Sequence, residues 1–191
     1  QRTIPPGLEW VDGDGTFLES VTFEDATGAS PFTFLGGGLA VTTGGFVVEG
    51  MVLDVTDPTA GQQRVVATFD PDGKSIAQIA RLAQPRIDFQ ASHVTIDERA
   101  RFFRAGRRAV SPDGRLYLAP EWDLYRIVVM DMQGNTLDTI ERDVVARRRT
   151  AEELEDAERS FAFSRDDGRP LPEFEFELAP TVQPISGLDF R

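Results

Sequence analysis

The sequence of 191 residues contains no cysteine, a single histidine and, among its 20 basic residues, a single lysine. Without cysteine the chain has no disulfide, no thiolate metal ligand and no cysteine nucleophile. No apolar run approaches the roughly 20 residues that a membrane-spanning helix needs, so we predict no membrane span. The 40% of hydrophobic and 27% of charged residues are typical of a globular protein with a buried core.

The formal net charge of −12 is spread unevenly along the chain. Residues 1–63 contain one basic and nine acidic residues, a net charge of −8. Residues 64–149 contain fifteen basic and twelve acidic residues (+3), and residues 150–191 contain four and eleven (−7). An acidic chain repels phosphate backbones at long range, so we do not expect general nucleic-acid binding. The arginine-rich middle still allows a local contact with an anion.

Residues 107–143 have the clearest strand pattern. Short runs rich in β-branched and aromatic residues alternate with turn sequences, SPDG at 111–114 and MQGN at 132–135. Proline presets φ and glycine accepts positive φ, which suits tight turns. We therefore predict one four-stranded antiparallel sheet with Asp113-Gly114 and Gln133-Gly134 in its turns. Four strands of this size are typical of one blade of a β-propeller.

A second copy of this pattern is predicted over residues 38–82, and a partial one over residues 8–23. Residues 185–191 have the pattern of an inner strand that begins a further blade. Two inserts interrupt the order, one at residues 83–106 and a helical one at residues 147–162.

The helical insert contains a sequence pattern that marks the N-terminus of a helix. Thr150 and Glu153 have the spacing of a capping box. Leu154, Ala157 and Phe161 fall on one helical face, so we expect this face on the sheet rims with Leu154 buried.

Residues 109–140 resemble an NHL repeat, whose theme is an inner strand, "dG", "iyVaD", "RIqvfd" and "G". The matching elements are Ala109-Val110, Asp113-Gly114, Leu116-Tyr117-Leu118-Ala119, Arg126-Ile127-Val128-Val129 and Gly134. The resemblance implies an all-β fold, a six-bladed, NHL-like bacterial β-propeller of four-stranded antiparallel blades with one short helical insert. It makes residues 1–191 part of one such domain.

The same resemblance bears on partners and ligands. A propeller removes its exposed sheet edges by closing, so we expect further blades or a partner chain to complete the ring. Residues 120–123 (PEWD) replace the acidic and asparagine positions usual at that loop, so a family ligand contact there does not carry over. Calcium-dependent lactonases on such propellers bind metal with scattered acidic and asparagine side chains, and the single asparagine here, Asn135, lies in a predicted turn.

Two places have the residue types of a metal or catalytic site. Residues 12–15 (DGDG) could begin a calcium loop, but they also suit a hairpin turn, which we favour. His93, near Asp97 and Glu98, could bind a metal or act as a general base, but a lone histidine is more often structural. We therefore assign no catalytic residue and expect no cofactor and no metal.

A basic run lies in and after the first insert. It consists of Arg99, Arg101, Arg104, Arg107 and Arg108 around Phe102 and Phe103. It could bind a phosphate, an RNA loop or an acidic partner. The interpretation that we favour is a solvated hairpin whose arginine stems cover apolar surface. We favour a solvated charge run for Arg147, Arg148 and Arg149 as well.

Trp122 stands between Glu121 and Asp123 in a predicted loop. Exposed, it would be a binding anchor; buried, it would fill the gap between blades. The candidate binding surface predicted from the sequence comprises Trp122, Glu121, Asp123, Arg101, Arg104 and Phe103.

These patterns favour a binding or scaffold propeller that presents loops to a protein or a small ligand. Two alternatives stay open: a hydrolase or lactonase with a site at the central channel, and RNA binding through residues 99–108. Whether the protein is an enzyme is open too. We expect a bacterial protein located outside the cytoplasm, in the periplasm or secreted.

Overall fold

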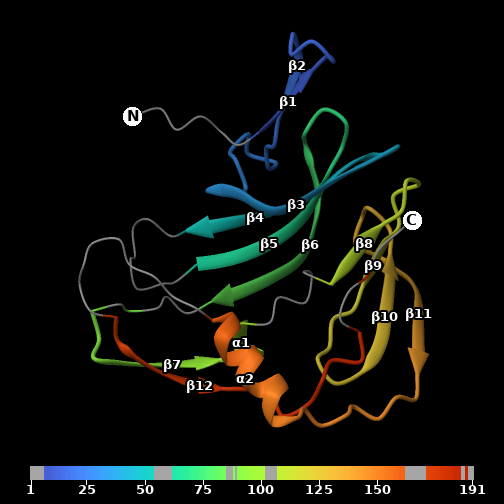
Figure 1. Ribbon diagram of the computed structural model, residues 1–191. Helices are drawn as coiled ribbons and strands as arrows, with labels where there is room; N and C mark the ends of the chain where they lie inside the picture. The colour runs from blue at the N-terminus through green and yellow to red at the C-terminus, as the bar shows by residue number, and fades with distance from the viewer. Residues whose placement is uncertain are drawn as a thin grey trace.

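The computed structural model describes residues 7–53, 62–84, 88, 90–101, 107–161, 171–185 and 188. These residues form two four-stranded antiparallel sheets, a β-hairpin, a parallel strand pair and two helices. Figure 1 shows the two larger sheets side by side, with the hairpin at one end and the parallel pair and a helix below. The all-β prediction with four-stranded antiparallel sheets is confirmed, while the described residues form no closed ring.

Sheet 1 contains β3 (Phe34–Thr42), β4 (Gly45–Leu53), β5 (Gln62–Phe69) and β6 (Ser75–Gln84), paired in that order. The first six residues of β4 and the last five of β5 are buried without alternation. Such continuous burial is typical of strands covered on both faces. Sheet 1 is therefore the middle layer of the molecule.

The hairpin covers one face of sheet 1. It contains β1 (Gly7–Val11) and β2 (Phe17–Thr22). Leu8, Trp10 and Val21 of the hairpin pack against a cluster that includes Phe23, Phe32, Phe46, Val48, Val65, Ala67 and Phe69. The Phe23 ring is the centre of this cluster, with its centroid 5.7 Å from that of Phe46 and 4.7 Å from that of Phe69.

Sheet 2 covers the other face of sheet 1. It contains β8 (Arg108–Val110), β9 (Leu116–Leu118), β10 (Tyr125–Met130) and β11 (Thr136–Arg142), paired in that order. These are the four strands predicted over residues 107–143. Val47 and Val66 of sheet 1 pack against Leu116, Leu118 and Met132 in one buried cluster.

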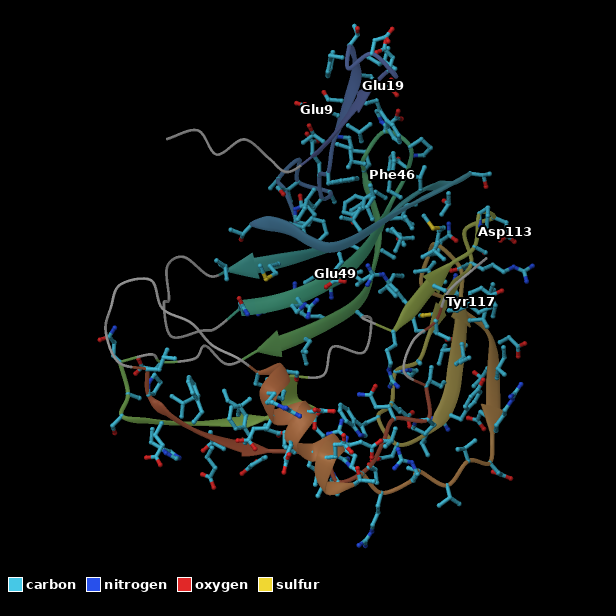
Figure 2. The ribbon with its side chains drawn as sticks, in the orientation of Figure 1. Glu9, Glu19, Phe46, Glu49, Asp113 and Tyr117 are labelled. Atoms are coloured by element: carbon cyan, nitrogen blue, oxygen red, sulfur yellow. The ribbon has the colours of Figure 1, made fainter. Side chains whose placement is uncertain are left out.

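Two polar contacts join the sheets inside this apolar layer. The Thr68 side chain of β5 is fully buried, and its Oγ1 donates to the Met132 carbonyl at 2.6 Å and accepts from the Ala77 amide at 3.1 Å. Glu49 of β4 is 2% exposed and is paired with Arg108 of β8 at 2.7 Å and with Arg64. Figure 2 labels Glu49 among the strands of sheet 1.

One turn recurs five times among the described residues. It begins at Asp12, Asp25, Asp70, Ser111 and Asp131. A side-chain oxygen of this first residue accepts the backbone N–H four residues later each time. The fourth residue is always glycine, with φ between 79° and 86°. Glycine adopts this left-handed conformation without steric cost, so the pattern D/S-x-x-G fixes the turn locally.

Two of the turn aspartates, Asp25 and Asp131, have a lowered pKa. The Thr27 hydroxyl and backbone donors lower the pKa of Asp25, and Asn135 together with backbone donors lowers the pKa of Asp131. Hydrogen bonds to a carboxylate favour its charged form. The turn at residues 12–15, which the sequence also allowed as a calcium loop, belongs to this group, as predicted.

The parallel pair is the element that the sequence reading missed. It consists of β7 (His93–Asp97) and β12 (Glu173–Glu177), and the short helix α1 (Glu98–Arg101) follows β7. The strand β12 has the sequence EFEFE, whose alternation is typical of a strand with one exposed face.

The predicted helix is present as α2 (Ala151–Ser160), with the capping box. The Glu153 amide donates to Thr150 Oγ1 at 3.2 Å, and the Thr150 amide donates to Glu153 Oε2 at 2.8 Å. The prediction that Leu154 is buried was wrong: no residue of α2 is buried. The helix lies at the surface, and Phe161 at its end stacks on Phe176 of β12, not on a sheet rim.

Residues 185–191 lie mostly outside the described residues, so the predicted further strand stays a prediction there. Ile185 is described; it is 5% exposed and lies outside any strand. It packs with Ala119 and Ile127 on the face of sheet 2 that looks away from sheet 1. Among the described helices, neither has the length and apolar character that crossing a membrane requires.

Candidate binding surface

The loop between β9 and β10 carries Trp122. Its side chain is buried, with 9% of its surface exposed, and its Nε1 donates to the Thr181 carbonyl at 3.3 Å. The guanidinium carbons of Arg99 and Arg149 lie 5.9 and 5.5 Å from the indole centre, within cation–π range. Of the two arrangements that the sequence allowed, the structure shows the buried one. Trp122 joins elements of the fold and is not an exposed anchor.

The carboxylates beside Trp122 are engaged within the fold. Asp123 accepts two hydrogen bonds from Arg99, at 2.8 and 3.3 Å, and one from the Thr181 hydroxyl at 2.6 Å. Glu121 accepts from Arg126 Nη1 at 2.6 Å. Asp123 and Glu121 remain 39% and 33% exposed as side chains, so a partner can still reach them.

A second ion pair lies close by. Arg149 donates to both carboxylate oxygens of Glu98, at 2.7 and 2.9 Å, and the Ala179 amide donates to the same carboxylate at 2.8 Å. Both charged side chains are mostly buried, 13% and 12% exposed. The interpretation of residues 147–149 as a solvated charge run is therefore wrong for Arg149, because its charge is compensated by a carboxylate 51 positions away. Bidentate geometry makes this kind of pair a strong one.

Three arginines of the basic run serve the fold. Arg99 holds Asp123, and Arg108 holds Glu49. Arg107 is 5% exposed and donates to the carbonyl oxygens of Ile185 and Glu121. Burial lowers the pKa of Arg107 to about 10. The solvated hairpin favoured from the sequence is therefore wrong for the buried Arg107 and the mostly buried Arg108, whereas the side chain of Arg99 stays 44% exposed.

The other members of the predicted surface are not placed by the structure. Phe103 and Arg104 lie outside the described residues, and Arg101 is described as the last residue of α1 without its side chain. Their part in binding stays a prediction.

His93 lies at the start of β7, exposed, with Nε2 3.3 Å from Glu175 Oε2 of the neighbouring strand. Asp97 lies at the other end of β7, where its Oδ1 accepts the Arg99 amide at 2.8 Å. The two residues that could have formed a metal or base site therefore point to different neighbours. Within the described parts of the chain, no three histidine or carboxylate side chains gather as metal ligands would.

The surface between α2 and β12 is hollowed into an open groove with a volume of about 500 Å³. Phe161 and Phe176 are among its lining residues, and their rings stack with centroids 5.6 Å apart. The other described residues that line it are Glu155, Glu158 and Arg159 of α2. An apolar contact surface bordered by two glutamates and one arginine has a net negative border, which suits a ligand with both an apolar and a cationic part.

The reverse face of the strand pair is acidic. Glu173, Glu175 and Glu177 are exposed, whereas Phe174 and Phe176 alternate with them and are half-buried. The residues across the ladder from the three glutamates are His93, Thr95 and Asp97. Both the groove and the reverse face of the strand pair therefore present carboxylates.

In comparisons with known proteins, the chain matches no family model, no curated protein and no solved structure. The NHL-like character of residues 109–140, the six blades and the bacterial origin remain predictions.

The sequence reading missed the groove because its two sides are far apart in the chain. The local signals were the EFEFE alternation of β12 and the glutamates Glu155 and Glu158 of α2. The apolar face of α2 that ends at Phe161 was recognised, but not that its partner is Phe176, since parallel pairing of β12 with β7 has no local sequence pattern.

Proposed function

We propose that this chain is an arc of a β-propeller that serves as a binding module or scaffold, and that its ligand is a basic segment of a partner protein. We infer this ligand class from the groove between α2 and β12, which has stacked phenylalanines and glutamates at its border. The net charge of −7 over residues 150–191 adds long-range attraction for a cationic segment.

The layered arrangement supports the propeller part of the proposal. The hairpin, sheet 1 and sheet 2 follow one another in chain order, and each covers the next through an apolar cluster. Face-to-face stacking of consecutive four-stranded sheets is the architecture of propeller blades.

The arginines support protein binding over RNA binding. Arg99, Arg107 and Arg108 donate to carboxylate or carbonyl oxygens of the fold. Contact with a phosphate would require giving up these bonds, and a donor or acceptor left buried without a partner costs about 1–3 kcal/mol.

The test uses a fluorescent peptide of alternating lysine and leucine, titrated by anisotropy with the whole chain. Glu155→Lys and Glu158→Lys, which reverse charge at the groove, should each weaken binding about fivefold to tenfold. Glu152→Lys is the matched control, because it makes the same charge change on α2 outside the groove residues. A peptide that does not bind, or an equal effect of the control, contradicts the proposal.

A single-stranded RNA titrated in parallel distinguishes RNA binding from the proposed binding of a basic protein segment. Tighter binding of RNA than of peptide, with a steep decrease as salt rises, would replace the proposed function by RNA binding.

A further inference from the structure

The contact between consecutive layers repeats at the same position of the turn. The Asp70 turn places Gly73 on β2, where a Cβ at Gly73 would lie 2.7 Å from Val21 Cγ1. The Asp131 turn places Gly134 on β6, where a Cβ would lie 3.4 Å from Ile79 Cδ1. Each time a turn glycine of one layer covers the last strand of the layer before it.

The covered residue also repeats. Val21 stands nine positions after Asp12, which begins the hairpin turn, and Ile79 stands nine positions after Asp70. Both lie in the strand that follows their turn. Ile140 stands nine positions after Asp131, in β11. The three layers therefore offer an equivalent aliphatic residue to the layer that follows.

At one end of the stack this residue is not covered. Ile140 is 40% exposed and Leu137 of the same strand is 54% exposed, and every residue of β11 is exposed. Exposed strand edges with apolar side chains are sites of pairing or packing with another sheet.

At the other end the matching turn has no described neighbour. Gly15, the turn glycine of the hairpin, has a φ of +83°, close to the values of Gly73 and Gly134. Unlike them, it has no described atom within 4 Å of a Cβ placed on it. The hairpin stands out from the sheets and carries the exposed Glu9 and Glu19, as Figure 2 shows. The stack thus has an uncovered strand at one end and an unoccupied turn of the matching kind at the other.

We propose that two copies of this chain associate head to tail, with the Asp12 turn of one copy seated on β11 of the other and Gly15 over Ile140. The contact continues the interface that already joins the three layers, which is why the occupant is a second copy. It joins two different surfaces, so it is heterologous and either closes into a ring or propagates. It uses the ends of the stack and not the groove, so its test is independent of the proposed function.

The test measures the mass of the whole chain by sedimentation over a concentration series. The wild type should form dimers or larger species as concentration rises. Ile140→Glu places a charge on the strand and should leave a monomer, whereas Thr139→Glu, on the other face of β11, is the control and should associate.

The matching variant of the turn is Gly15→Asn. Asparagine tolerates positive φ, so the hairpin should keep its turn while the added Cβ blocks the close approach. Gly28→Asn is its control, because Gly28 has φ +79° in the same kind of turn and also has no described atom within 4 Å of a Cβ. Gly15→Asn should be monomeric and Gly28→Asn should associate.

Mixing Ile140→Glu with Gly15→Asn tests whether the contact joins the turn of one copy to β11 of the other. Ile140→Glu keeps an intact turn and Gly15→Asn keeps an intact β11, so an equimolar mixture should form one-to-one dimers that neither forms alone. Three results would overturn the proposal: a wild type that stays monomeric at every concentration, a Gly15→Asn variant that associates like wild type, or a mixture that stays monomeric.

Discussion

Replacement of Thr68 by valine tests how the two sheets are joined. In Thr68→Val the Met132 carbonyl loses a donor at 2.6 Å and the Ala77 amide loses an acceptor at 3.1 Å. Thr68 is fully buried, so water does not replace the lost bonds. A buried polar group without a partner costs about 1–3 kcal/mol, so two cost about 2–6 kcal/mol. The methyl group that replaces the hydroxyl returns about 1 kcal/mol through added apolar burial.

We therefore expect Thr68→Val to lower the free energy of unfolding by about 1–5 kcal/mol, measured as a shift of the denaturant midpoint at constant slope. Thr68→Ser is the control, since it keeps both hydrogen bonds and removes one methyl group, at a cost of about 1 kcal/mol. Hydrogen exchange of the Ala77 amide should become faster in the valine variant and stay slow in the serine variant. If the valine variant is as stable as the serine variant, the hydroxyl does not join the sheets.

Three further predictions concern charges and the helix cap. Glu49→Ala should cost about 3–5 kcal/mol by denaturant unfolding, because it removes the buried carboxylate that pairs with the charge of Arg108, and the double variant Glu49→Leu with Arg108→Leu should recover part of it. Thr150→Ala should cost about 1 kcal/mol and Thr150→Ser much less; unchanged thermal unfolding of the alanine variant would mean that the cap does not stabilise α2. The pKa of Glu153 is lowered to about 2, first by its hydrogen bond with Arg147, so its charge stabilises the fold above pH 4.5 and this contribution is lost as the pH falls towards 2. Glu153→Gln should flatten this part of the pH dependence of α2 helicity, measured by circular dichroism.

The two four-stranded sheets could be predicted because short local sequence patterns specify their turns. Aspartate or serine followed at the fourth position by glycine marks the ends of β5 and β10 as well as the start of β9. Each such turn uses only its own side chain and backbone, so no distant residue has to be known. The capping box of α2 could be predicted for the same reason, because its two hydrogen bonds join only Thr150 and Glu153.

The candidate site could not be predicted in the same way. Arg149 and Glu98 lie 51 positions apart, and Arg99 lies 24 positions from Asp123. A run of charged residues is predicted to be solvated when its ion-pair partners are unknown. For a tryptophan in a loop, the local sequence favours neither an exposed nor a buried side chain. The parallel pairing of β7 with β12 brings these elements together, and it depends on contacts that sequence spacing does not encode.

The recurring turn also decides which face of each sheet meets its neighbour. Because side chains alternate along a strand, a slip of one residue would turn Thr68 and Val66 away from sheet 2. The Asp70 turn prevents this slip, since its glycine must occupy the position with φ +81°. Aliphatic residues in the layer between the sheets can be exchanged at modest cost if their volume is kept. The specificity of the stacking therefore depends more on the turns, which set the register, than on the identity of the apolar residues that fill the space between the sheets.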